Sequence, residues 1–550
     1  MPFNPALNLR AFAVQSTSAA PPRIHALYLR DGKYDGMTRD DVAATFAAFQ
    51  AQTATKRLAL FFHGGLVDKA SGQQGAANEY EKYNDLVFPL FFIWESGIWE
   101  VLAHHLPLIF AETIFGRIVD HANDLLTSKL SQAEGAQRRD RTALDVNLDW
   151  ADGSPEKLVL TGADIDSFMS AIKNDEQIQH EAVAIARTSN AVDAPMPPTR
   201  MPTTTIRGSL QLSPRTYMSP EVVCAVRAAY AQASRRNLGT AERLDALPFD
   251  IGGAIEAAWV IAKAAVRVVI NCVKRLVAQR HHGVPCTIVE EVLRALYLAN
   301  AGSSIWEEMK RETEYAFGPD SAMYGGTAVV EELCAQLKQK PGTPVTLVGH
   351  STGAIYIGNF LRHVDIALRA QGDTTTMFDI ILMAPASTMD FYAANYASRV
   401  RGIRIFQMND ATEQQDHLMS KDVGPDDPSI LGKVYPRSLL YLVSGVCEYF
   451  EGEEGSGPHA FDGDDMPILG MDRFYAQSSV FAPGDYPSVG QARTQFAVAP
   501  PTATTKYVRV PSPTAPTPDD GYRSTALKHG NFPGDGPTMN SIRVCFKHGL

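Results

Sequence analysis

Cysteine is scarce and scattered in this sequence. The 550 residues include six cysteines, and no two of them form a C-x-x-C pair. Structural zinc sites and disulfide frameworks depend on closely spaced cysteines. We therefore expect free, mostly buried thiols and no metal site.

Basic residues are outnumbered by acidic ones. The 50 lysines and arginines face 61 aspartates and glutamates, which gives a formal net charge of −11. Proteins that bind nucleic acids neutralise phosphates with concentrated positive charge. The charge balance therefore predicts no nucleic-acid partner.

Long apolar runs that are free of charge are missing as well. The nearest candidate is 251–276, in which Glu256, Lys263, Arg267 and Lys274 lie seven, four and seven residues apart. This spacing places the four charges on one face of a helix. A charge at bilayer depth costs about 2.5–3.5 kcal/mol. We predict an amphipathic helix packed on the protein and no transmembrane span, with a lid or a weak contact with a membrane surface as the alternative.

Targeting and cofactor signatures are also absent. The N-terminus has no basic start followed by a long apolar stretch, so no secretory signal is evident and we expect a cytoplasmic location. No phosphate-binding lysine motif or dinucleotide glycine motif occurs in a usable context, and we expect no cofactor. The adjacent pairs His104-His105 and His281-His282 point about 100° apart on a helix, so we interpret them as structural.

Short apolar runs, several of them closed by glycine, are typical of strands that are covered on both faces of a parallel sheet. Helical patterns separate them, which favours βαβ units. From about 98 to 317 the chain is mainly helical, apart from a Pro/Thr-rich stretch at 193–208. The strand-like runs are 23–32, 56–66, 86–97, 343–349, 378–386 and 402–410.

The fold class that we expect is α/β, with a mostly parallel central sheet flanked by helices and a large helical cap inserted into it. Residues 1–97 and 318–550 would form the two parts of the core, and residues 98–317 would form the cap. We hypothesise that the cap covers the carboxyl ends of the strands and favours apolar acyl groups.

The stretch LVGHSTGAIYIGNFL contains the strongest chemical signal. Ser351 lies between Gly349 and Gly353, after a strand-like run and before a helical pattern. In a G-x-S-x-G turn the serine hydroxyl is presented above the sheet, and larger flanking side chains would collide with the strand and the helix. A serine becomes a nucleophile only when a base takes its proton and donors stabilise the oxyanion.

With His350 and Thr352, this turn resembles the nucleophile elbow of the α/β-hydrolase superfamily, specifically that of its serine esterases and lipases. The segment FFHGGL at 61–66 is similar to the His-Gly segment that supplies one oxyanion donor in that superfamily. The resemblance implies an oxyanion hole formed by the N–H groups of Thr352 and Gly65, with the N–H of Leu66 as the alternative to Gly65.

The resemblance also implies supporting roles for several residues next to these groups. Gly349, His350 and Gly353 would shape the elbow. His63 and Gly64 would support the oxyanion loop.

The resemblance implies that a histidine follows the acid along the chain. Of the histidines beyond 402–410, His417 is too near the acid candidates, His459 lies in an acidic loop, and His548 is almost at the chain end. His529, beside two glycines and after the strand-like TKYVRV, is the predicted base.

The acid is expected after the seventh strand, where RIFQMNDATEQQD offers three carboxylates. We choose Asp410 because it comes first after the strand, with Glu413 and Asp416 as alternatives. The competing interpretation is that these residues cap a following helix.

The resemblance implies a Ser-His-Asp hydrolase that cleaves small-molecule or lipid-like carboxylic esters through an acyl-enzyme intermediate. Thioesterase, lactonase or amidase activity on the same residues remains open. So does a hydrolase-fold protein that binds ligands without catalysis. The sequence does not specify an oligomeric state.

Overall fold

The computed structural model describes residues 20–52, 57–65, 69–94, 109–110, 112–133, 158–187, 218–238, 250–298, 302–417, 435–448, 465–476, 481, 486–499, 505–516 and 521–550. The Pro/Thr-rich stretch at 193–208, the pair His104-His105 and His459 lie outside these residues.

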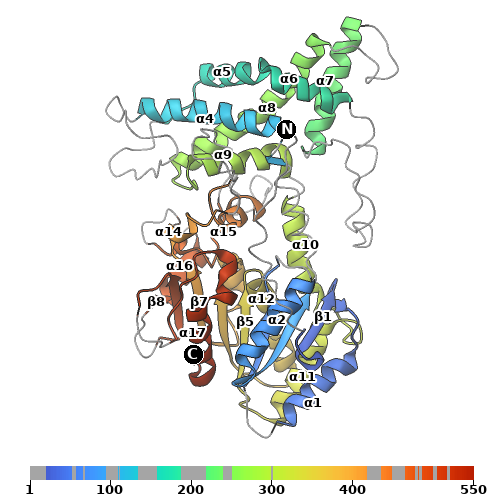
Figure 1. Ribbon diagram of the computed structural model, residues 1–550, viewed down its shortest axis with the longest axis vertical. Helices are drawn as coiled ribbons and strands as arrows, with labels where there is room; N and C mark the ends of the chain where they lie inside the picture. Colours follow the sequence, from blue (N-terminus) through green and yellow to red (C-terminus); the bar gives the residue numbers. More distant parts are fainter. Residues whose placement is uncertain are drawn as a thin grey trace.

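One nine-stranded sheet organises the described chain (Figure 1). Its strand order is β2-β1-β4-β3-β5-β6-β7-β9-β8, and every pairing is parallel except that of β1 with β2. The predicted α/β class and the mostly parallel sheet are confirmed. The strands are β1 (Ala26–Arg30), β2 (Lys33–Tyr34), β3 (Arg57–Phe62), β4 (Val87–Trp94), β5 (Val345–His350), β6 (Phe378–Met383), β7 (Val400–Met408), β8 (Ala497–Val498) and β9 (Tyr507–Ser512).

The two faces of the sheet are both apolar. In β3, Leu58, Leu60 and Phe62 belong to one buried cluster, whereas Ala59 and Phe61 belong to another on the opposite face. Successive side chains of a strand point to opposite faces, so a run without polar residues is needed when helices cover both sides. This is why the central strands appear in the sequence as continuous apolar runs.

Helices cover each face. α1 (Arg39–Gln50), α11 (Gly325–Gln339) and α12 (Gly353–Ala370) contribute to the first cluster. α2 (Lys69–Tyr83) and α17 (Gly536–His548) contribute to the second, and Figure 1 shows both in front of the sheet.

The remaining helices in the C-terminal part are short. The helix that follows β6 ends at Asn395, and the next strand starts at Val400, directly after Arg399 with a φ of 64°. These short helices of the C-terminal part are α13 (Met389–Asn395), α14 (Asp410–Glu413), α15 (Leu439–Leu442), η8 (Val443–Cys447), η9 (Asp472–Tyr475), α16 (Pro487–Gln495) and η10 (His529–Gly534).

A second group of helices lies between β4 and α11 in the sequence and gathers at one end of the molecule (Figure 1). α10 (Gly302–Tyr315) leads from this group back to the sheet. The division of the chain at 97/98 and 317/318 stays a prediction. The group consists of α4 (Thr113–Ala133), α5 (Gly162–Lys173), α6 (Glu176–Arg187), α7 (Pro220–Leu238), α8 (Ile251–Val277), α9 (Val284–Val292) and η6 (Leu293–Leu298).

α8 is the amphipathic helix expected from the sequence. Its charged residues Glu256, Lys263, Arg267 and Lys274 are exposed. Its buried side chains on the opposite side belong to the core cluster and include Ala254, Ala257, Ala258, Ile261, Ala262, Ala265, Val268 and Val269. No helix in the described part of the chain is long and apolar enough to cross a bilayer. Contact with a membrane surface stays a prediction.

Buried charges join this helical group to the rest of the protein. Arg275 of α8 is fully buried, and its Nη2 and Nη1 atoms lie 2.7 and 3.0 Å from Glu290 Oε2 and Glu291 Oε1 of α9. His282 contacts Glu290 Oε1 at 2.7 Å and, on its other side, Asp465 Oδ2 at 3.3 Å. Burial opposes ionisation of Glu290, but His282 and Arg275 outweigh it and lower the pKa of that carboxyl to about 2.

The charge of Arg275 should be essential for stability. We expect Arg275→Met to lower the free energy of unfolding by about 3–5 kcal/mol, because it leaves buried carboxylates without their cation. Arg267→Met, on the exposed face of the same helix, should change it by less than about 0.5 kcal/mol. Urea denaturation measures both, and equal losses would contradict this role.

Candidate active site

Ser351 occupies the sharp turn between β5 and α12. Its φ of 54° is in the left-handed region, which non-glycine residues rarely adopt. The turn is held from both sides: the N–H of Ser351 donates to the Met383 carbonyl at 2.9 Å, and its carbonyl accepts from the N–H of Ala386 at 3.0 Å. Such a conformation costs about 1–3 kcal/mol and persists only where the surroundings enforce it.

The two glycines of the turn are required by close approach. A Cβ at Gly353 would overlap the carbonyl oxygen of Phe62 in β3. A Cβ at Gly349 would lie 2.8 Å from Ile357 Cδ1 and 2.9 Å from the carbonyl carbon of Gly353. The strand, the turn and the helix can therefore approach each other only with glycine at both positions.

His529 meets Ser351, as expected from the sequence. Its Nε2 atom lies 2.9 Å from Ser351 Oγ, and both residues are buried. Burial, together with the neighbouring His350, holds the pKa of His529 well below its usual value. The imidazole is therefore neutral near pH 7.

Two contacts fix the main chain of His529. The Nε2–H of His350 donates to the His529 carbonyl at 3.0 Å. The N–H of His529 donates to Asp416 Oδ2 at 2.8 Å. His350 thus ties the segment that carries His529 to the end of β5, directly before Ser351.

Asp410 does not contact His529. It is the first residue of α14, where its Oδ1 and Oδ2 atoms accept hydrogen bonds from Tyr441 at 2.7 Å and Gln414 at 2.8 Å. The structure therefore does not bring Asp410 to the predicted base, and its role as the acid stays a prediction. The cap of α14 is Asn409, whose side chain accepts from the N–H of Thr412, so Asp410 is not the capping residue of the competing interpretation.

Glu413 and Asp416, the two alternative acids, have different hydrogen-bond partners. Glu413 is buried and accepts a hydrogen bond from Ser438, and burial raises its pKa well above the usual value. Burial also raises the pKa of Asp416, although the N–H of His529 opposes this. The Nδ1 atom of His529 has no partner in the described chain. Asp416, which accepts the main-chain N–H of His529, is the carboxylate of the three that contacts this residue.

The predicted oxyanion loop packs directly on the elbow. A Cβ at Gly64 would lie 3.1 Å from Ser351 Cβ, and a Cβ at Gly65 would lie 2.9 Å from Thr352 Oγ1 and overlap Met309 of α10. Glycine is thus needed for the loop to approach the serine. Leu66, the alternative donor, lies outside the described residues.

His63 hydrogen-bonds both to this loop and to the end of β4. Its Nδ1–H donates to the Gly64 carbonyl at 2.7 Å, and its Nε2 accepts from the N–H of Trp94 at 3.1 Å. Burial is the main reason that its pKa is lowered to about 4. A neutral imidazole with this tautomer links the ends of β3 and β4.

A cavity of about 850 Å³ adjoins Ser351. Cavities of about 300–1,000 Å³ are typical of sites that bury a small ligand. Its lining residues come from β3, α2, β4, the elbow, Met383 and the segment 525–536. Within the described chain, the helical insertion at 98–317 contributes none of them, which does not match the hypothesis that the cap forms the acyl site.

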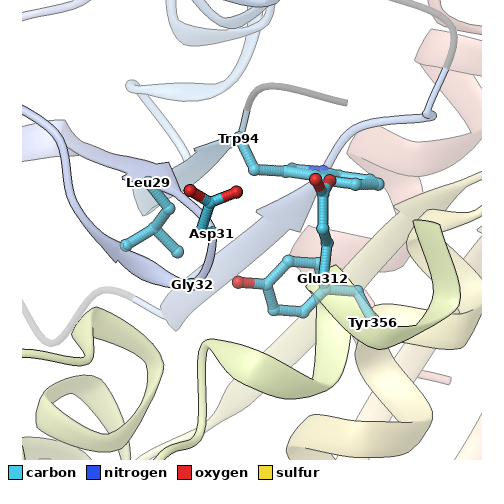
Figure 2. Close-up of a pocket in the computed structure, with 6 residues that line it drawn as sticks. All are labelled: Leu29, Asp31, Gly32, Trp94, Glu312 and Tyr356. Atoms are coloured by element: carbon cyan, nitrogen blue, oxygen red, sulfur yellow. The ribbon is translucent and has the colours of Figure 1, made fainter. Parts of the chain in front are cut away.

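A second cavity lies nearby, at the carboxyl ends of β1 and β4 (Figure 2). Figure 2 shows the Trp94 indole over the Glu312 carboxylate, with the ring of Tyr356 below them. The volume of this second cavity is about 10 Å³, which holds roughly one water molecule. It is too small for a substrate.

The described residues contain no cluster of three or more histidine, cysteine or acidic side chains that could hold a metal ion. His282, from the second histidine pair, lies between two carboxylates in the buried charge network.

Comparisons of the chain with family models, with curated proteins and with solved structures find no match. What the protein does must therefore be inferred from its own geometry.

The conformation of Ser351 predicts an unusual order of stability. Ser351→Gly should be more stable than Ser351→Ala by about 1 kcal/mol, because both lose the hydroxyl and only glycine adopts a φ of 54° without strain. At Ser170, an exposed helical position of α5, alanine should instead be more stable than glycine by about 1 kcal/mol. Urea denaturation of the four variants checks the reversal, which would fail if alanine were preferred at both sites.

Proposed function

We propose that this protein is a hydrolase-like α/β protein that cleaves carboxylic esters with a serine nucleophile. The observation that carries the proposal is the 2.9 Å contact between Ser351 Oγ and His529 Nε2, made at a left-handed turn between a strand and a helix. Residues 178 positions apart meet there, in a buried place next to a ligand-sized cavity.

The chemistry follows from these positions. His529 Nε2 takes the proton of Ser351 Oγ as that oxygen bonds to the ester carbonyl carbon. The imidazolium then returns the proton to the departing alcohol, and the acyl group remains on Ser351. Water, activated by His529, cleaves the acyl-enzyme and regenerates the serine.

The N–H groups of Gly65 and Thr352 are assigned to the oxyanion. Gly65 lies against Thr352, which directly follows the nucleophile. Donors fixed by the main chain need no reorganisation when charge develops on the substrate oxygen, and the loss of one costs about 10²–10³ in kcat.

Asp416 is assigned the acid role in place of Asp410. Its carboxylate holds the main chain of His529, and the unpartnered Nδ1 belongs to that same residue. Catalytic hydrogen bonds are often incomplete without substrate. A carboxylate at Nδ1 orients the imidazole and stabilises its protonated form.

Thioesters, lactones and amides react through the same groups. Rates measured on matched ester, thioester and amide substrates would rank these bond types.

A binding protein without catalysis is the alternative from another class. The 2.9 Å contact between His529 Nε2 and Ser351 Oγ favours catalysis, because a general base must lie within hydrogen-bond reach of the proton that it takes.

Hydrolysis of p-nitrophenyl acetate tests the proposal. Ser351→Ala and His529→Gln should each lower kcat by at least about 10³-fold, and the double variant should be no worse, because the two residues act as one unit. His548→Gln, an exposed histidine near the chain end, serves as the control and should retain full activity. Hydrolysis that survives Ser351→Ala would exclude this mechanism.

The acid is tested by a matched pair. Asp416→Asn should lower kcat at least about a hundredfold, because the amide oxygen still accepts the His529 N–H while the negative charge is lost. Asp410→Asn should change kcat less than about threefold, since its partners are Tyr441 and Gln414. The reverse ranking, measured with the same ester, would restore Asp410 as the acid.

A further inference from the structure

The cavity beside Ser351 is a channel between α2 and the segment 525–536, and we refer to it as the α2 channel. Its floor is the face of the sheet that carries Phe61, Phe91, Ile93 and Val348. These side chains are apolar and belong to the core cluster under α2 and α17. The floor therefore suits the hydrocarbon part of a ligand.

The channel exists because the wall formed by α2 has little bulk. Gly72, Gly75 and Ala76 line it, and they share one face of the helix with Glu79, seven residues beyond Gly72. A Cβ at Gly75 would meet no atom within 4 Å. A helix of ordinary composition would fill this space with leucine or isoleucine side chains.

The channel runs from Ser351 and His529, at the carboxyl ends of the strands, toward the amino ends of the strands. Gly72 lies at the level of the site, since a Cβ there would lie 3.2 Å from His63 Nε2. Glu79 follows two helical turns later, roughly 10 Å farther along α2 at 1.5 Å per residue. Ser351 and Glu79 therefore lie at different depths of one cavity.

Glu79 is partly exposed and lines the channel together with Lys82. Within the described chain it makes no hydrogen bond or close ion pair, although Lys82 attracts it from a longer distance. Burial raises the pKa of this carboxyl to about 7, and Lys82 limits the rise. Lys82 itself contacts Met539 Sδ through Nζ at 2.7 Å. A carboxylate that faces a cavity without a bonded partner favours a hydrogen-bond donor or a cation on the ligand.

We propose that the α2 channel binds the acyl arm of the ester, and that Glu79 selects acyl chains that end in a cationic hydrogen-bond donor. This inference rests on the proposed function, because it requires that Ser351 carry the acyl group. The acyl carbon would sit at Ser351, the chain would cross the floor of Phe61 and Phe91, and its end group would reach Glu79.

The test uses p-nitrophenyl octanoate and its ω-ammonium analogue at pH 8, where Glu79 is mostly ionised. Wild-type protein should show a higher kcat/KM for the ammonium ester. Glu79→Gln should lower the ammonium-to-methyl ratio of kcat/KM about tenfold, because the amide keeps the size and loses the charge. Glu81→Gln, the same change at an exposed position of α2 outside the channel, should leave the ratio unchanged.

A second variant tests the channel without its charge. Gly75→Trp should fill the open space and lower the octanoate-to-acetate ratio of kcat/KM at least tenfold, whereas Glu81→Trp should not. If Gly75→Trp lowers kcat/KM only for esters that carry the octyl chain on the alcohol side, the channel binds the alcohol arm and the assignment to the acyl arm is wrong.

The two levels of the proposal fail differently. If Ser351-dependent hydrolysis of acetate occurs but neither ratio responds to Glu79→Gln or Gly75→Trp, the channel inference is wrong and the proposed function stands. If no ester is cleaved in a Ser351-dependent manner, the proposed function fails and the channel inference fails with it.

Discussion

The account depends on one contact, the approach of Ser351 Oγ to His529 Nε2 across the carboxyl end of the sheet. Neither group is reactive alone, and the chain enforces their meeting from both sides. The elbow presents the hydroxyl because Ser351 is held in a left-handed conformation. The base is brought to it by a loop whose main chain is bonded to His350 and Asp416. Both residues are buried, so a substrate must reach them through the cavity that adjoins them.

Much of this arrangement could be predicted from the sequence because its signals are local. A parallel sheet produces apolar runs, and the G-x-S-x-G turn needs small residues at Gly349 and Gly353 for steric reasons that the structure bears out. His529 could be chosen because few histidines follow the seventh strand. For the acid, the sequence offers three carboxylates in one short segment, and the order along the chain, on which the choice of Asp410 was based, does not show which of them contacts His529. Which of them faces the base depends on where α14 begins, at Asp410, and this is decided by packing and not by chain order.

The cavity beside Ser351 is the feature that the sequence predicts least. α2 has little hydrophobic patterning, and its small residues gain meaning only when the sheet behind them is known. The sequence directed attention to the helical insertion, whose long amphipathic helix is instead packed within its own group. Arg280 and His282, which follow this helix, join the group to Asp465 in the C-terminal part. The helical group lies at one end of the molecule (Figure 1), whereas the cavity that we propose as the acyl site lies beside α2. The cytoplasmic location stays a prediction.

The central claim is that the protein activates the Ser351 hydroxyl. The most direct measurement is the reaction of the intact chain with a fluorophosphonate, followed by mass spectrometry of its peptides. The account predicts one phosphonyl adduct, on the peptide that contains Ser351, which forms much more slowly when His529 is replaced by glutamine. An unmodified Ser351 in folded protein would contradict the account.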